Sequence, residues 1–252
     1  MTGDFHWPDF LPAFRLAARQ AGFQSHTMAQ TSAGPIEVWQ RGGSGQHVYI
    51  SSGIHGDEPA GPLALLELMK RGFFADSDTD WTICPALNPT GLLMGTRGNA
   101  DGVDLNRDYW NRSTLETKAH TAWLDSREHP DLFLSLHEDC DSAGFYFYEI
   151  NLGQDQPQRA QAILQSVEPW FQPEAGPEID GHIPRGPGWI YHAAEADVPD
   201  GWPEAIYLSK SGCPLSFTFE TPSGAELDRR IAAQAAAVDA AITWVGGRSH
   251  GR

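Results

Sequence analysis

Residues of the types that bind metal ions or transfer protons stand directly after three apolar segments of this sequence. His55 and Glu58 lie in GIHGDE, which follows HVYISS. His137 ends the segment DLFLSLH, and Glu220 ends LSFTFE. Catalytic zinc commonly takes three protein ligands, such as two histidines and one glutamate, and leaves one further position for water. His55, Glu58 and His137 would supply such a set, and Glu220 would remain as an acid–base residue.

The spacing of His55 and Glu58 by three residues can bring both side chains to one side of a tight turn or a helix start. Gly53 and Gly56 allow the unusual backbone that such a turn needs. An ordinary surface pair at a helix N-terminus has the same spacing, so the short motif alone does not define a site. Glu220 is harder to explain without a function, because a glutamate after a buried strand is costly without a partner.

Strands and helices alternate along the chain, and this order predicts how the residues are positioned. Apolar runs predict strands, and helical spacing predicts helices. The expected strands are 36–40, 47–53, 80–87, 131–137, 144–150 and 215–220, and the expected helices are 8–22, 58–72, 114–128, 156–170 and 225–245. Alternation of this kind predicts an α/β protein with three α/β/α layers and a mixed, mostly parallel central sheet. Sites in such sheets form at the carboxyl ends of strands, where His55, His137 and Glu220 are expected.

Two long segments between these elements are rich in polar residues, glycine and proline. Residues 88–113 are expected to form a loop, and within it GTRGNADGVDLNRDY carries Arg97, Asp104, Asn106 and Arg107. Residues 172–203 are rich in proline and glycine. Loops on a rigid scaffold often carry specificity. We therefore expect the segment 180–207 to form a wall of the pocket, with His182, Arg185, Tyr191 and His192.

Composition excludes several classes of function. The net charge is −16 and the sequence pI is about 4.8, so the surface should repel nucleic acid and anionic membranes. Three cysteines without a CxxC motif predict no disulfide framework. The first residues do not read as a signal peptide, and no apolar segment is long enough to span a bilayer. We expect a cytoplasmic protein whose oligomeric state the sequence does not indicate. No G-x-S-x-G elbow or phosphate loop occurs.

The motifs HGDE, DGVDLNRDY, SLH and FTFE, in that order within residues 47–220, resemble the zinc carboxypeptidase family of carboxypeptidase A type. The segment NPTGLLMGTRGNADGVDLNRDY is most similar to small bacterial members such as murein peptide amidases. The succinylglutamate desuccinylase and aspartoacylase branch is similar in the same motifs. The resemblance implies one zinc-peptidase-like catalytic domain over residues 1–252.

The resemblance also implies residue roles, which physical chemistry supports. His55, Glu58 and His137 match the ligands of one zinc ion per chain, and Glu220 matches the catalytic glutamate. Arg97 matches the arginine that polarises the scissile carbonyl. Asn106 and Arg107 match the pair that holds a substrate carboxylate, and Asp104 matches the acid that orients His55. An arginine can stabilise a developing oxyanion, and its planar fork suits a carboxylate. A ligating histidine usually donates its other N–H to a carboxylate or a carbonyl.

The function that the resemblance implies is hydrolysis of an amide bond next to a free carboxylate. A zinc metallopeptidase of carboxypeptidase or peptide amidase type is the first choice, with a small peptide as substrate. The alternative is a deacylase of N-acyl amino acids. Deacylases of this branch usually carry a further C-terminal β domain, and the last predicted helix ends at residue 245, which favours the peptidase. A non-catalytic protein that captures carboxylate-bearing peptides is a third reading.

Several residues have competing interpretations. A second metal could use Asp57, Glu138, Asp139 and Asp141, but solvated side chains are the simpler reading. A structural metal usually has four protein ligands, often cysteine, so Cys140 is the residue to inspect. Family members carry a mobile tyrosine, for which Tyr191 and Tyr207 are the candidates. Arg112 competes for either arginine role, His120 and His129 read as ordinary histidines, and FYFY at 145–148 reads as strand packing.

Overall fold

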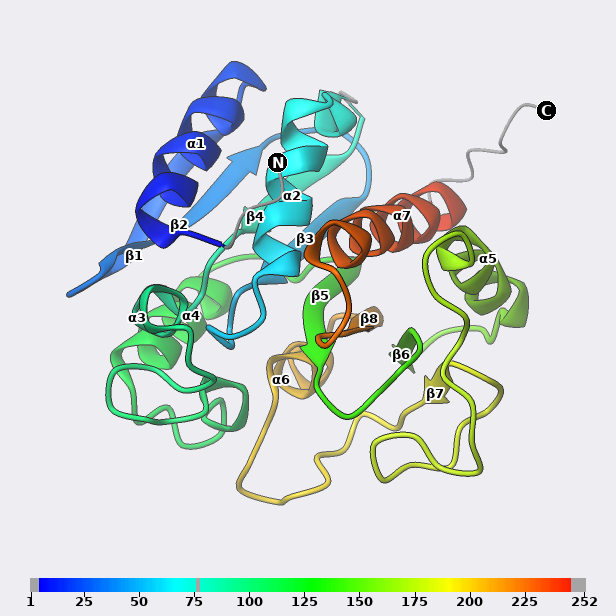
Figure 1. Cartoon of the computed structure of the whole chain (residues 1–252). Helices are drawn as coiled ribbons and strands as arrows, with labels where there is room; N and C mark the ends of the chain where they lie inside the picture. The colour runs from blue at the N-terminus through cyan, green and yellow to red at the C-terminus, as the bar shows by residue number, and fades with distance from the viewer. Residues whose placement is uncertain (1–4, 76–77, 246–252) are drawn as a thin grey trace.

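The computed structural model describes residues 5–75 and 78–245 and has one eight-stranded sheet with helices on both faces (Figure 1). The strands are β1 Gln24–Thr31, β2 Gly34–Arg41, β3 His47–Ser52, β4 Asp80–Cys84, β5 Leu132–Asp139, β6 Tyr146–Asn151, β7 Trp189–Tyr191 and β8 Leu215–Pro222. The helices are α1 Trp7–Gln20, α2 Ala60–Lys70, α3 Pro89–Met94, α4 Leu115–Asp125, α5 Pro157–Val167, α6 Glu204–Lys210 and α7 Leu227–Val245, with short 3₁₀ turns at Phe73–Ala75 and Leu105–Arg107. The expected domain limits of 1–252 extend beyond these residues.

The sheet is mixed, with a parallel centre. Its strand order is β1-β2-β4-β3-β5-β8-β6-β7. The pairs β4–β3, β3–β5 and β5–β8 are parallel, as is β6–β7, and the other three pairs are antiparallel. The carboxyl ends of β3, β5 and β8 therefore meet at one edge. In the β5–β8 register His137 is opposite Glu220, so both side chains emerge on the same face of the sheet.

Two apolar cores hold the layers together. One face of the sheet packs against α1, α2, α5 and α7, which lie in front of it in Figure 1. The other face packs against α4 and α6 around Tyr49 and Phe133. Within the part of the chain that the structure describes, no helix is long and apolar enough to cross a membrane. The α/β/α layering and the mixed, mostly parallel sheet confirm the predicted fold.

The predicted elements are confirmed, and four further elements were not predicted from the sequence. The strand β1 (QSHTMAQT) is mostly exposed and lacks apolar alternation, so it has no strand signal. The helix α3 lies inside the segment expected to be a loop, where the Asn88 side chain accepts a hydrogen bond from the Gly91 N–H. The three-residue strand β7 and the seven-residue helix α6 lie within or directly after the proline-rich segment. Elements this short present too few residues for a periodic pattern.

Candidate metal centre and substrate pocket

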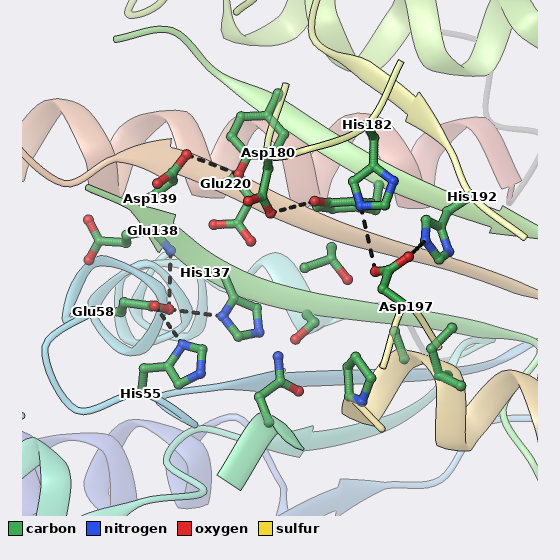
Figure 2. Close-up of a pocket in the computed structure, with 18 of the residues that line it drawn as sticks. His55, Glu58, His137, Glu138, Asp139, Asp180, His182, His192, Asp197 and Glu220 are labelled. Atoms are coloured by element: carbon green, nitrogen blue, oxygen red, sulfur yellow. Dashed lines mark hydrogen bonds and ion pairs between the residues drawn. The ribbon is translucent and has the colours of Figure 1, made fainter. Parts of the chain in front are cut away.

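The carboxyl ends of β3, β5 and β8 open into one pocket of about 670 Å³. Figure 2 shows its two sides: His55, Glu58 and His137 lie at one side, His182, His192 and Asp197 at the other, and Glu220 lies between them. Every predicted site residue except Asp104 lines the pocket: His55, Glu58, Arg97, Asn106, Arg107, His137 and Glu220. Asp104 lies directly behind His55.

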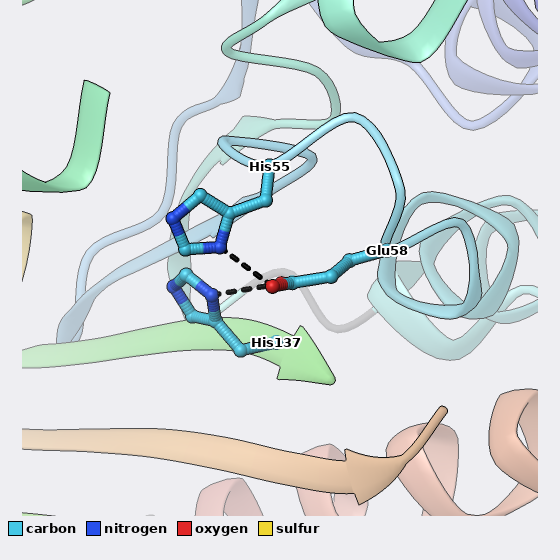
Figure 3. Close-up of side chains that lie close together, drawn as sticks. All are labelled: His55, Glu58 and His137. Carbon is cyan, nitrogen blue, oxygen red and sulfur yellow. Dashed lines mark hydrogen bonds and ion pairs between the residues drawn. The ribbon is translucent and has the colours of Figure 1, made fainter. Parts of the chain in front are cut away.

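The three predicted metal ligands come together through their donor atoms (Figure 3). The Nδ1 atom of His55 lies 2.6 Å from Glu58 Oε1, and the Nδ1 atom of His137 lies 2.9 Å from Glu58 Oε2. All three side chains are buried. Two imidazole nitrogens and one carboxylate that converge from three directions are the donor set that catalytic zinc sites use. The residues present therefore fit a metal ion of that kind.

The turn between β3 and α2 brings His55 and Glu58 together, and it requires glycine at two positions for different structural reasons. Gly53 has a φ of +61°, a left-handed conformation that favours glycine and confirms the expected unusual backbone. Gly56 does not have a positive φ. A Cβ at Gly56 would lie 1.9 Å from the carbonyl carbon of Gly91, so this position needs glycine because the backbone of α3 passes against it. The amide of Asn88 ties α3 to the turn by donating to the Ile54 carbonyl.

Asp104 holds the far side of the His55 ring. Its Oδ1 lies 3.1 Å from His55 Nε2, which donates to it. Burial alone would raise the pKa of Asp104, but this hydrogen bond, the charge of His55 and the charge of Arg97 lower it. Asp104 therefore stays ionised and fixes the ring so that Nδ1 points at Glu58. This contact is the one that a ligating histidine usually makes with a carboxylate.

The charges of the cluster are coupled. Burial would raise the pKa of Glu58, but the adjacent His55 and His137 lower it to about 2. Burial would lower the pKa of His55, but Glu58 and Asp104 raise it to about 9. For His137 burial dominates and the pKa is lowered. A metal ion bound by this set would displace the proton that His55 shares with Glu58, so binding would be linked to proton release.

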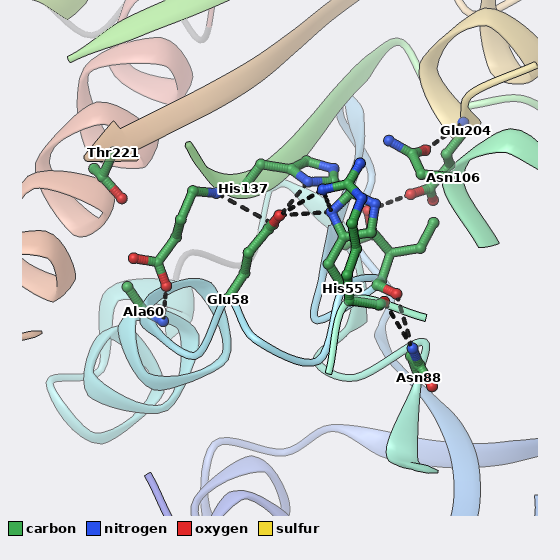
Figure 4. Close-up of polar contacts among 12 residues, drawn as sticks. His55, Glu58, Ala60, Asn88, Asn106, His137, Glu204 and Thr221 are labelled. Atoms are coloured by element: carbon green, nitrogen blue, oxygen red, sulfur yellow. Dashed lines mark hydrogen bonds and ion pairs between the residues drawn. The ribbon is translucent and has the colours of Figure 1, made fainter. Parts of the chain in front are cut away.

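Three further predicted residues, Arg97, Asn106 and Arg107, line the pocket with the metal ligands, and Figure 4 shows Asn106 beside Glu204. Arg97 donates from Nε to Asp104 over 3.1 Å, and its Nη1 lies 3.6 Å from Glu58 Oε1. The Asn106 side-chain oxygen accepts the Glu204 backbone N–H, which leaves its amide nitrogen as the group available to a ligand. Arg107 is exposed at the pocket, and its Nη1 donates to the Asn106 carbonyl.

Glu220 faces the pocket from the strand beside His137. Burial, together with Glu58, Asp139 and Asp180, raises its pKa well above the ordinary value. Within the described chain, no side chain donates a hydrogen bond to its carboxyl group. A carboxyl with free oxygens beside a metal-ligand set is positioned to exchange protons with a bound substrate or water.

The open alternatives are resolved in part by position. Tyr207 is buried and donates to Asp125, and Tyr191 packs on Arg185, so neither candidate tyrosine lines the pocket. Tyr146 and Tyr148 line it instead. The interpretation of FYFY as packing is therefore half wrong, because Phe145 and Phe147 face the core while the tyrosines of the alternating strand face the pocket. Alternation could have indicated this.

Other candidates lie away from the metal ligands. Arg112 packs over Tyr207, and His120 is buried in a network with Tyr49 and Tyr109. Neither lines the pocket, and His129, also outside it, is exposed. In the expected wall, His182 and His192 line the pocket, whereas Arg185 and Tyr191 turn away.

The acidic residues and the cysteine near the ligands lie outside the His55–Glu58–His137 group. The Glu138 carboxylate accepts from the Ala60 N–H and from Arg230, which occupies it away from the ligand set. Asp139 accepts from the Tyr146 hydroxyl. Cys140 is exposed on the pocket wall and is not a member of the His55–Glu58–His137 group.

A family model described as the succinylglutamate desuccinylase/aspartoacylase catalytic domain matches residues 44–169, which is half of the chain. The chain belongs to this family. The match includes His55, Glu58, His137 and the loop with Arg97 and Arg107. This family and the structures similar to the chain confirm the resemblance to metallocarboxypeptidase-like hydrolases.

Several solved structures similar to this family member are described as candidate metallopeptidases or carboxypeptidases. One, a candidate metallopeptidase from Shewanella amazonensis SB2B, has a TM-score of 0.82 at 25% identity and covers 94% of this chain and 92% of its own. Another, from Shewanella denitrificans OS217, has a TM-score of 0.80 at 26% identity over 94% and 89%. A metallo-carboxypeptidase from Burkholderia cenocepacia, at 19% identity and TM-score 0.71 over 95% and 69%, shares the fold.

Among proteins compared by sequence, Carboxypeptidase SOL1 of Arabidopsis thaliana is 36% identical over 96 residues. That match covers 30% of this chain and 19% of the plant protein. The chain therefore spans less than a fifth of that relative, and the similarity concerns only that shared part.

Proposed function

We propose that this protein is a zinc-dependent hydrolase that cleaves an amide bond next to a free carboxylate, as a carboxypeptidase or peptide amidase does. The observation that carries the proposal is the convergence of His55 Nδ1 and His137 Nδ1 on the Glu58 carboxylate in the pocket that Glu220 also lines. Because the site draws on residues from His55 to Glu220, we propose that the chain acts as one catalytic domain.

His55, Glu58 and His137 would hold the zinc ion, as the chemistry of these donors favours. Bound zinc supplies a Lewis acid that makes water nucleophilic near neutral pH and polarises the substrate carbonyl. Glu220, which lines the pocket on the strand beside His137, takes the proton of the attacking water and returns it to the leaving amine. Arg97, beside Glu58, supplies positive charge where the carbonyl oxygen becomes negative.

Arg107 and Asn106 would bind the substrate carboxylate. The guanidinium of Arg107 is exposed to the pocket and offers two parallel N–H donors, and the Asn106 amide nitrogen adds a third donor. Holding the carboxylate here fixes the scissile bond relative to Glu220, which lowers the entropic cost of the reaction.

A deacylase of N-acyl amino acids is the second candidate, favoured by the description of the family model that matches residues 44–169. Its substrate also carries a free carboxylate next to an amide, so the same residues would serve. The two functions differ in what occupies the other side of the pocket: a peptide chain or a short acyl group.

Metal content and hydrolysis test the proposal together. Protein purified without added metal should contain about one zinc per chain at this centre, and His137→Ala should lose it. Wild type should hydrolyse members of a panel of C-terminal peptides and N-acyl amino acids, and the panel separates the two candidates. Glu220→Gln should keep its zinc but lose roughly 10²–10⁴-fold in kcat, the usual contribution of a general acid–base.

Two controls make the result decisive. His26→Ala changes an exposed histidine outside the pocket and should keep metal and activity. Failure to take up metal on reconstitution would overturn the hydrolase proposal. Full activity in Glu220→Gln would overturn the role of that residue and favour a protein that binds peptides without cleaving them.

A further inference from the structure

A second group of metal-binding side chains lies at the other side of the pocket, on the segment between α5 and α6. His182 Nε2 is 3.6 Å from Asp197 Oδ2, and His192 Nε2 is 3.4 Å from Asp197 Oδ1. Figure 2 shows both rings directed at this carboxylate. In the sequence the three residues spread over 16 positions, His182 to Asp197, without a known spacing, which is why the sequence indicated only a pocket wall.

The hydrogen bonding of His192 defines which of its ring nitrogens is free. Its Nδ1 lies 2.5 Å from the Ala193 carbonyl oxygen, which can only accept a hydrogen bond. Nδ1 therefore carries a hydrogen, and Nε2 is the ring nitrogen that faces Asp197. Nε2 is thus the atom of His192 that a metal ion held together with Asp197 would bind. This arrangement, with the second nitrogen bound to a backbone carbonyl, is the usual one for a metal-ligating histidine.

The surrounding backbone holds His182 in place at some cost. Asp180, just before it, has a φ of 45°, a left-handed conformation that is uncommon for a residue with a side chain. The Tyr148 hydroxyl donates to Asp180 over 2.5 Å, and two backbone hydrogen bonds link Ile179 with His182. The Tyr148 ring meets the His182 and His192 rings edge-on. Strained backbone held by several contacts is typical of functional sites.

We propose that His182, His192 and Asp197 bind a second divalent metal ion, separate from the centre formed by His55, Glu58 and His137. Two ligands of tetrahedral zinc with bonds of about 2.0–2.1 Å lie roughly 3.3–3.4 Å apart, close to the separations of 3.4 and 3.6 Å found here. Two imidazoles and a carboxylate suit zinc or a similar first-row ion. The remaining coordination position is available to water or to an oxygen of the substrate.

Ion pairing alone accounts poorly for this arrangement. The Asp197 side chain is 66% exposed, and exposed pairs of this kind contribute little to stability. A bound metal ion would explain the left-handed turn and the hydrogen-bonded orientation of the His192 ring, because it would join the start and the end of the pocket wall. The site goes beyond the proposed hydrolysis and does not depend on it.

Metal stoichiometry tests the second site in the full chain. Metal is removed with a chelator, and Zn²⁺ is then titrated into wild type, His137→Ala, Asp197→Asn and the double variant, with Asp200→Asn as the matched exposed control. We expect two ions in wild type, one in each single variant and none in the double variant. Circular dichroism checks folding, and the exposure of Asp197 means that its substitution should leave the fold intact.

The two sites are distinguishable in the outcome. Equal stoichiometry in wild type and Asp197→Asn would overturn the second site and leave the cluster as two histidine–aspartate pairs. Loss of an ion in Asp197→Asn but not in His137→Ala would support the second site and overturn the first. Co²⁺ as a replacement ion adds a spectrum: the absorption that Asp197→Asn removes should be that of a four-coordinate ion with nitrogen and oxygen ligands.

Discussion

Glu58 holds the centre together, because one carboxylate lies between two imidazole nitrogens at 2.6 and 2.9 Å. Each histidine is fixed differently. His55 is oriented by Asp104 from behind, whereas His137 is fixed by its place in β5. The ligand set is thus preorganised by groups that would not themselves touch the metal, and a metal entering it meets donors that already point inward.

Arg107→Lys tests carboxylate recognition at a single residue. Lysine keeps the charge but loses the planar fork, so kcat/KM should fall about 10-fold, mainly through KM, for substrates with a free carboxylate. Steady-state kinetics on a peptide and on its C-terminal amide measure the effect. For the C-terminal amide, kcat/KM should change little on substitution, because the amide has no carboxylate for Arg107 to bind.

Arg112→Lys is the matched control for Arg107, since Arg112 packs on Tyr207 outside the pocket. Its kinetics should equal those of wild type. An equal loss for acid and amide substrates in Arg107→Lys would show that Arg107 does not bind the carboxylate.

The sequence predicted the position of a site residue wherever that residue follows directly after a strand. His55, His137 and Glu220 each follow an apolar run, so pattern and residue type agreed, and the structure brings them into one pocket. Tyr146 and Tyr148 were missed because the whole aromatic run was interpreted as packing, although its alternation places the two tyrosines on one face and the two phenylalanines on the other. His192 and Asp197 carry no short-range signal, since a backbone turn and not a motif brings them together.

At the level of elements, the site depends on close contact between α3 and the turn before α2. Gly56 and Gly91 meet backbone to backbone, and the Gly56 N–H donates to the Thr96 carbonyl. This contact positions the loop that follows α3 and carries Arg97. Sequence reasoning placed residues 88–113 in a loop, and it could not foresee that a short helix inside it supports the metal ligands.

Gly56→Ala should push the turn before α2 away from α3. The added methyl would lie 1.9 Å from Gly91 and 2.2 Å from its carbonyl oxygen, so the backbone must move. Overpacking of this kind costs about 1–3 kcal/mol or more, and we expect a lower free energy of unfolding together with weaker metal binding. Denaturant titration and metal titration measure the two effects.

Gly42→Ala is the control, because nothing lies within 4 Å of a Cβ at Gly42 and its φ is not in the left-handed region. Its stability should match that of wild type within about 0.5 kcal/mol. A Gly56→Ala variant that is as stable and binds metal as well as Gly42→Ala would contradict the proposed support by α3.

The helix α6 is attached through a buried carboxyl group. Glu204 accepts from Ser51 and Tyr49, and its backbone N–H donates to Asn106. Burial raises its pKa from 4.5 to about 8, more than the two hydroxyl donors lower it. The folded chain therefore retains a proton that the unfolded chain releases between pH 4.5 and 8.

Glu204→Gln should remove this pH dependence. Because the folded-state pKa is raised, the contribution of Glu204 to stability is fully present below pH 4.5 and is lost as the pH rises toward 8. The free energy of unfolding of wild type should therefore fall relative to Glu204→Gln by up to about 1.4 kcal/mol per pH unit in that window. Urea titrations at several pH values measure it.

The exposed Glu168→Gln serves as the control for Glu204→Gln and should follow wild type at every pH. A constant difference between wild type and Glu204→Gln from pH 4.5 to 9 would show that Glu204 has an ordinary pKa. In that case its burial would be compensated by contacts that keep the charged form.

Across the whole molecule, the pocket joins segments that are far apart in the chain. Its proposed metal ligands come from a turn before α2 and from β5, its proposed acid–base residue from β8 and its other wall from the segment before α6. The pocket of this acidic chain, whose net charge is −16, is lined by Arg97 and Arg107 as well as by Asp139, Asp180 and Asp197. A substrate carboxylate is attracted to the two arginines and repelled by the three aspartates.

Assembly from distant segments has a consequence for stability, because only the folded chain presents the complete ligand set. Zinc that binds the native state alone should raise the free energy of unfolding by about 2.7 kcal/mol when its free concentration is 100 times Kd. For a chain of this length, 1 kcal/mol corresponds to roughly 2–4 °C in Tm, so we expect a rise of about 5–10 °C. Calorimetry with zinc and with a chelator measures this difference.

The experiment is best done in Asp197→Asn, so that only the first centre responds, and His137→Ala in the same background should abolish the rise. A rise that survives His137→Ala in that background would mean that zinc stabilises the fold somewhere other than the His55–Glu58–His137 centre.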